Sequence, residues 1–320
     1  MAWIIGIDEA GYGPNLGPFV MTSVACRVPE HGHDPDLWQL LRPAVRRGTD
    51  ADEGQLLIDD SKIVYTARGL AGLERGVLAT LWRNGNEQAA SLASFVDWAC
   101  PDDRDELACE AWYRGAQALP VHLAPDELGP EVARFDTACA EAEIGCWHVR
   151  SVIVCPRRFN ALLDESGTKG AVLAHALANL LRCERARLAG DEPLSFFIDK
   201  HGGRNTYAAM LQHCIPDGMV FAVQEGMARS VYRVHGLDRE VRLTFQPRAD
   251  TEHFCVALAS MTSKYLRELL MLEFNRFWQE HVPDLKPTAG YPGDAARFFE
   301  AIRQAIATLG LREEAVWRRK

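Results

Sequence analysis

The chain opens on an apolar run that ends in two carboxylates and a glycine-rich turn, Trp3-Ile4-Ile5-Gly6-Ile7-Asp8-Glu9-Ala10-Gly11-Tyr12-Gly13-Pro14-Asn15-Leu16-Gly17-Pro18. β-Branched and aromatic residues dominate the run, and clustered glycine and proline end it. A second β-rich stretch, from Phe19 to Val28, follows. The pattern predicts a strand, a tight turn and a second strand, with Asp8 and Glu9 at the end of the first.

A second strand of buried character also ends in a carboxylate, Leu194-Ser195-Phe196-Phe197-Ile198-Asp199. One acid at such a position is commonly a cap or turn former, and that alternative stays open here. If the two strands are neighbours, Asp8, Glu9 and Asp199 meet at one edge of the sheet, where they repel one another unless a cation lies between them. Oxygen ligands suit Mg²⁺ or Mn²⁺, and two such ions promote phosphodiester hydrolysis by activating water and stabilising the leaving oxygen.

The rest of the pattern predicts a mixed α/β sheet followed by a helical C-terminal part. Further extended segments are expected at 149–154, 219–223 and 241–245. Apolar spacing predicts helices at 66–82, 168–182, 251–279 and 293–309.

Length and composition indicate an ordinary globular protein. The 320 residues suggest two domains or one large domain with an insertion, and 48% hydrophobic with 25% charged residues exclude disorder, collagen, coiled coil and a membrane span. The N-terminus lacks a cationic signal segment, so a cytoplasmic location is expected. Nine cysteines without a C-x-x-C pair fit reduced thiols better than disulfides or a zinc site.

The negative charge of the chain is concentrated in one segment. The net charge is -9, from 35 basic and 44 acidic residues, and residues 84–144 hold 13 acidic and 3 basic side chains. The remaining residues carry 31 acidic and 32 basic side chains, a balance of +1, so they are able to present a basic face to nucleic acid. We expect residues 84–144 to form a helical insertion. Binding of a protein partner is one role open to it.

Five motifs, in the same order along the chain, resemble those of the ribonuclease HII family. The opening turn resembles the family's G-x-D-E-A-G-R-G-P-x-x-G-P signature, and Asp60-Ser61-Lys62 resembles its D-S-K motif. Further along, the chain resembles the family's third acidic strand with the helix before it, its K-A-D motif with the following helix, and, at Gly290-Tyr291-Pro292, its G-Y-P motif. The matching segments are 6–18, 60–62, 168–169 with 197–199, 248–268, and 290–292. They span most of residues 3–300 and leave 84–144 unmatched.

The resemblance implies a ribonuclease H-like fold, a mixed five-stranded sheet flanked by helices, with a catalytic core over 1–250 and a helical part over 251–320 that completes the site. It implies four metal-binding catalytic acids, Asp8, Glu9, Asp199 and Asp250, and two Mg²⁺ or Mn²⁺ ions. For substrate contact it implies the turn, cationic side chains and a tyrosine: Gly11, Tyr12, Gly13, Lys62, Lys264, Arg267 and Tyr291. Ser260 and Ser263 are interpreted as helix packing. The implied activity is endonucleolytic cleavage of RNA strands or single ribonucleotides paired with DNA.

One departure from the family pattern bears on the substrate. The family's G-R-G reads Gly11-Tyr12-Gly13 here, so a neutral ring replaces a charged, planar donor. Two alternatives follow, a nuclease with a DNA substrate and a catalytically silent nucleic-acid-binding protein of the same fold. A third, a sugar kinase or actin-like ATPase, requires a second glycine-rich phosphate loop, and the sequence contains neither that loop nor a Walker A pattern.

Overall fold

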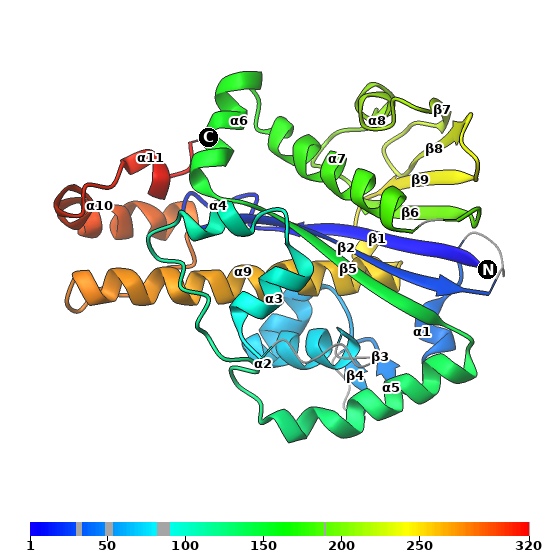
Figure 1. Ribbon diagram of the computed structural model, residues 1–320, viewed down its shortest axis with the longest axis horizontal. Helices are drawn as coiled ribbons and strands as arrows, with labels where there is room; N and C mark the ends of the chain where they lie inside the picture. Colours follow the sequence, from blue (N-terminus) through cyan, green and yellow to red (C-terminus); the bar gives the residue numbers. More distant parts are fainter. Residues whose placement is uncertain (30–33, 49–53, 82–89, 189, 320) are drawn as a thin grey trace.

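The computed structural model describes residues 1–29, 34–48, 54–81, 90–188 and 190–319 (Figure 1). Its centre is a mixed sheet of seven described strands in the order β5-β2-β1-β6-β9-β8-β7. These strands are β1 (Ala2–Ala10), β2 (Phe19–Val28), β5 (Gly145–Val154), β6 (Leu194–Asp199), β7 (Met219–Gln224), β8 (Ser230–His235) and β9 (Val241–Gln246). A short parallel pair, β3 (Val45–Arg46) and β4 (Leu56–Leu57), forms a separate sheet.

The expected five-stranded sheet is present as β5, β2, β1, β6 and β9. β2 is antiparallel to β1 and β5, whereas β6 is parallel to both β1 and β9. The sheet is larger than expected because β7 and β8 pair with each other and extend it antiparallel to β9. β8 was not predicted, although its apolar residues alternate with the exposed Arg233 and His235 as in a half-buried strand.

Helices cover both faces of the sheet (Figure 1). One face packs against α9 (Phe254–His281) and α2 (Ser61–Leu81), and the other against α6 (Pro156–Ser166) and α7 (Gly170–Arg187). The alternation of β1 produces the two cores, because Ile4 lies in the core beneath α9, whereas Ile5 and Ile7 lie in the core beneath α7. The remaining helices outside segment 84–144 are α1 (Leu37–Leu40), α8 (Ala208–Cys214), α10 (Pro292–Thr308) and α11 (Glu313–Val316).

The helices match the sequence predictions within a few residues. α7, α9 and α10 correspond to the predictions at 168–182, 251–279 and 293–309. α2 begins before the predicted Thr66, because the Asp60 carboxylate accepts a hydrogen bond from the backbone N–H of Lys62 at 2.8 Å, and the predicted end at Trp82 lies outside the described residues. None of the described helices has the length and apolar character that spanning a bilayer requires. All nine cysteines are described, and none forms a disulfide.

Segment 84–144 is helical in its described part and shares the core of the sheet domain. Residues 84–89 lie outside the described residues, and the rest contains α3 (Leu92–Ala99), α4 (Arg104–Ala108), the 3-10 helix η1 (Pro125–Leu128) and α5 (Gly129–Glu141). The Phe95 ring packs edge-on against Tyr265 of α9 at 6.2 Å between centroids. Buried Glu74 of α2 accepts backbone hydrogen bonds from Val121 and His122. The segment therefore packs on the core as part of it, and its protein partner stays a prediction.

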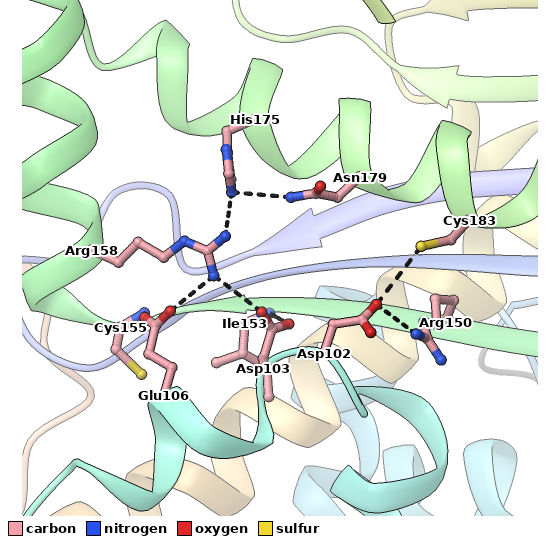
Figure 2. A network of polar contacts seen from close by, with 10 residues as sticks. All are labelled: Asp102, Asp103, Glu106, Arg150, Ile153, Cys155, Arg158, His175, Asn179 and Cys183. Carbon is pink, nitrogen blue, oxygen red and sulfur yellow. Dashed lines mark hydrogen bonds and ion pairs between the residues drawn. The ribbon is translucent and has the colours of Figure 1, made fainter.

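Carboxylates of this segment cover the outer edge of the sheet, as Figure 2 shows. Asp103 accepts the backbone N–H of Ile153 in the edge strand β5 at 2.8 Å, and Glu106 accepts that of Cys155 at 3.3 Å. Arg158 of α6 donates to both carboxylates, at 3.2 and 2.8 Å. An uncovered edge strand invites pairing with other chains, so these acids stabilise the sheet edge.

We expect Glu110→Gln to stabilise the protein in alkaline solution. Burial raises the pKa of Glu110 from 4.5 to about 7, against a smaller lowering by Arg157. Because the folded state binds this proton more tightly than the unfolded state, stability is lost as the pH rises from about 4.5 through 7. The neutral amide avoids that loss, with a gain on the order of 1–3 kcal/mol at pH 8 and little gain at pH 4.

Urea unfolding at pH 4, 6 and 8 measures this effect. The matched control is Asp105→Asn, because the Asp105 side chain is 100% exposed on the same segment, and its stability is expected to follow that of the wild type. Parallel pH profiles for Glu110→Gln and the wild type would contradict the prediction.

Candidate active site

Two carboxylates lie side by side at the carboxyl ends of adjacent parallel strands. β1 and β6 pair with Ile7 opposite Ile198, so Asp8 and Asp199 take the next positions on the two strands. Both isoleucines belong to the core beneath α7. Since successive side chains of a strand alternate, Asp8 and Asp199 point to the opposite face, which α9 covers.

The other two predicted acids flank this pair. Glu9 follows Asp8, and its backbone N–H donates to the Asp8 carboxylate at 2.8 Å. Asp250 lies in the 3-10 helix η2 (Ala249–Thr251), between β9 and α9. Asp199 accepts the backbone N–H of Ala249 at 2.9 Å, which ties η2 to the end of β6. The fold thus brings all four predicted acids to one end of the sheet.

Burial raises the pKa of all four carboxylates, and the charge of neighbouring acids adds to it at Asp8, Glu9 and Asp250. Burial raises the pKa of Asp8 well above 3.8, and the charges of Glu9 and Asp199 raise it further. Burial and Asp199 raise the pKa of Glu9 to about 8, and burial followed by the charges of Asp60 and Asp199 raises that of Asp250 to about 6. Burial also raises the pKa of Asp199. The arrangement is costly to ionise, so it favours the binding of positive charge.

The donor chemistry of the cluster fits hard divalent cations. Among the described residues, no three histidine, cysteine or carboxylate side chains converge tightly enough to form a ready-made metal site. The four acids nevertheless offer only carboxylate oxygens, the ligand type of Mg²⁺ and Mn²⁺, and a cation would relieve the repulsion that raises their pKa values.

Hydroxyl groups of α9 hold Asp8 in place. A hydrogen bond from the Ser260 hydroxyl lowers the pKa of Asp8 and so favours its ionised form, and the Ser61 hydroxyl lies 3.0 Å from that of Ser260. Ser263 lies 3.0 Å from the Asp8 carbonyl and 2.8 Å from the Thr22 hydroxyl. Both serines are buried in α9 where it packs on the sheet, as the sequence interpretation has it, and both in addition make polar contacts at the site.

The glycine-rich turn lies beside the acids and needs glycine at its first position. Gly11 has φ +83°, and a Cβ there would approach the Arg267 side chain to 2.4 Å. A Cβ on Gly13 would lie 4.0 Å from the Tyr291 ring, whose residue is 52% exposed. The ring of Tyr12 packs edge-on against Phe19, 6.2 Å between centroids. The structure thus brings the predicted turn and the predicted tyrosine together on one exposed surface.

Of the three predicted phosphate-contacting cations, one differs from the sequence interpretation. Lys62 is exposed, and its charge lowers the pKa of Glu9, Asp199 and Asp250. Lys264 lies 3.0 Å from Glu268 and 4.2 Å from the centre of the Tyr65 ring.

Arg267 is 2% exposed and donates to the carbonyls of Leu16 and Ala289. Arg267 therefore supports the turn from beneath, and its burial is incompatible with direct phosphate contact.

The C-terminus supports the same turn. Arg318 is fully buried and donates to the carbonyls of Tyr12, Pro14 and Gly17. Because the turn carbonyls take its donors, Arg318 is neither solvated nor able to touch a phosphate.

Sequence reasoning missed Asp60 and Ser260 as parts of the site. Asp60 raises the pKa of Asp250 and therefore lies within electrostatic reach of it. Its signal was the D-S-K resemblance, in which only Lys62 was selected as a contact. Ser260 carried no signal of its own, since a serine on an apolar helix commonly satisfies its hydroxyl within the helix.

β1 has an antiparallel neighbour on one side and a parallel neighbour on the other, and helices cover both faces, so the fold is the mixed α/β sheet that the sequence predicts. Among solved structures, the chain is similar to the RNase HII of Archaeoglobus fulgidus in its complex with PCNA, at 16% identity over 99% of this chain and 94% of that one, with a TM-score of 0.43. It is also similar to the ribonuclease H2 of Pyrococcus horikoshii, at 15% identity over 98% of this chain and 92% of that one, with a TM-score of 0.43. For Bst-RNase HIII in complex with Mn²⁺, the identity is 14% over 99% of this chain and 66% of that one, and the TM-score is 0.42. No protein-family model and no curated protein matches the chain.

Proposed function

We propose that the chain is a metal-dependent endonuclease that hydrolyses RNA strands, or isolated ribonucleotides, paired with DNA. The observation that carries this proposal is the pair Asp8 and Asp199 at adjacent strand ends, with Glu9 and Asp250 close enough to raise the pKa of Asp8. A protein that only binds nucleic acid gains nothing from such a cluster, because phosphate and carboxylate repel each other.

Each part of the site has a distinct task under this proposal. Asp8, Glu9, Asp199 and Asp250 would hold two Mg²⁺ or Mn²⁺ ions, which supply activation of water and stabilisation of the leaving oxygen when bound. Ser260 and Ser263 fix the position of Asp8. The turn at Gly11 to Gly13 and the exposed Tyr291 ring contact the sugars of the cleaved strand, and Lys62 and Lys264 add phosphate-directed charge.

The proposal is tested with three end-labelled duplexes in Mg²⁺ or Mn²⁺: DNA with a single ribonucleotide, an RNA/DNA hybrid, and DNA alone. We expect cleavage only of strands that contain ribose, and its loss in Asp8→Asn. If only the all-DNA duplex is cleaved, the protein is a nuclease whose substrate is DNA. Binding of all three without cleavage would replace the proposal with the silent binding protein.

A further inference from the structure

The surface around Tyr12 carries two cations from other parts of the chain. Lys169, the residue before α7, places its ammonium 4.7 Å from the centre of the Tyr12 ring. Arg204, in the loop after β6, lies close enough to lower the pKa of Tyr12, while burial and Glu9 raise it. A Cβ on Gly170 would lie 3.6 Å from the Arg204 guanidinium, so Arg204 also reaches the start of α7.

The loop that carries Arg204 is fixed by hydrogen bonds to its backbone. The Tyr207 hydroxyl donates to the Arg204 carbonyl at 3.1 Å and accepts the backbone N–H of His201 at 3.2 Å. Ser230 of β8 donates to the Asn205 carbonyl at 2.6 Å. Arg204 itself is exposed, so a held backbone presents a solvent-facing guanidinium at low ordering cost.

The charge of Arg204 is available for an anion. Within the described part of the chain, no carboxylate lies within ion-pairing distance of it. Its guanidinium lies 3.6 Å from the Met210 sulfur and 5.9 Å from the centre of the Tyr207 ring. Glu9 raises and Arg204 lowers the pKa of Tyr12, so Tyr12 lies within electrostatic reach of both the acidic cluster and Arg204.

We propose that Lys169 and Arg204 bind a phosphate of the cleaved strand next to Tyr12, and so supply the positive charge that the Gly11-Tyr12-Gly13 turn lacks. An aromatic ring between two cations combines stacking on a sugar or base with phosphate attraction. Lys169, before α7, and Arg204, after β6, thereby supply the phosphate-binding charge that a single arginine in the turn would supply. This inference rests on the proposed nuclease function.

The test compares Lys169→Ala/Arg204→Ala with Arg303→Ala/Arg312→Ala, which removes two exposed cations elsewhere, with side chains 56% and 82% exposed. Binding of the single-ribonucleotide duplex is followed by fluorescence anisotropy between 50 and 300 mM KCl, with Asp8→Asn present in every protein to prevent turnover. We expect the Lys169/Arg204 pair to weaken binding roughly tenfold and to reduce the slope of log K against log salt by about 1, since the loss of one phosphate contact removes about 0.9.

Steady-state cleavage by the same pairs with Asp8 intact separates the two proposals. We expect a higher KM with an almost unchanged kcat for the Lys169/Arg204 pair, and wild-type values for the control pair. Equal affinity and equal salt slope in both pairs, with cleavage retained, would overturn the phosphate site alone. Absence of cleavage by the wild type would overturn the nuclease proposal, and an unchanged salt slope in that case would overturn both.

Discussion

Asp8→Asn abolishes turnover and at the same time stabilises the metal-free protein, if the carboxylate cluster is the catalytic site. Asp8 is buried at 8% exposure among Glu9, Asp199 and Asp250, all of which raise its pKa. Neutralising it removes like-charge repulsion, which we expect to add on the order of 1 kcal/mol or more to the free energy of unfolding at pH 8. The folded pKa is raised, so the gain grows as the pH rises and is small near pH 4.

The same substitution removes a ligand for divalent cations. We expect cleavage to fall by roughly three orders of magnitude or more, and Mg²⁺ to raise the Tm of the wild type but not of the variant, because a cation that binds only the folded state stabilises it. Thermal melts with and without Mg²⁺ at pH 5 and pH 8, beside cleavage of the single-ribonucleotide duplex, measure all three effects.

Asp105→Asn again serves as the control, because its side chain is fully exposed on α4. If Asp8→Asn cleaves at the wild-type rate, the carboxylate cluster is not the catalytic site. A variant that loses both activity and stability would assign Asp8 a structural role.

The strands that position the acids were predictable because their signals are local. β1, β2 and β6 are apolar runs with clear ends, and Phe19–Val28 and Leu194–Asp199 match their predicted bounds. Their pairing is not local. That β1 and β6 are parallel neighbours in register follows from the whole sheet, and the sequence supported only the conditional statement that the acids meet if the strands are adjacent.

The polar residues beneath the turn show why the rest of the site was not predicted. Arg267 and Arg318 are charged, and charged side chains are normally exposed. Both are buried because backbone carbonyls of the turn and of residue 289 accept their hydrogen bonds. Those acceptors are supplied by a loop far away in the sequence, so no pattern around either arginine reveals them.

The acidic segment illustrates the same limit. Its charge predicts repulsion of a duplex, yet Asp103 and Glu106 bind backbone N–H groups of β5 and the guanidinium of Arg158. Charge counted along a sequence does not tell which carboxylates have partners within the fold.

Gly6→Ala is expected to destabilise the protein by at least about 3 kcal/mol, the upper part of the range for overpacking in a core. α9 crosses β1 so closely at this point that a Cβ on Gly6 would lie 2.2 Å from the Cys255 carbonyl carbon and from the Val256 nitrogen. Both atoms are backbone, so the helix has to move as a unit. That movement would separate Ser260 and Ser263 from Asp8, and cleavage should fall together with stability.

Gly6 is sensitive to substitution because α9 crosses β1 there. A glycine in another strand, without such a crossing, shows how much of the destabilisation comes from the contact with α9. Gly145, at the start of β5, has no atom within 4 Å of an added Cβ, so Gly145→Ala should change the free energy of unfolding by less than about 1 kcal/mol. Urea unfolding of both variants, with cleavage measured at a temperature where each is folded, makes the comparison. Equal stabilities for the two would mean that α9 tolerates displacement from β1. Wild-type activity in a destabilised but folded Gly6→Ala would show that the serines of α9 are not needed to hold Asp8.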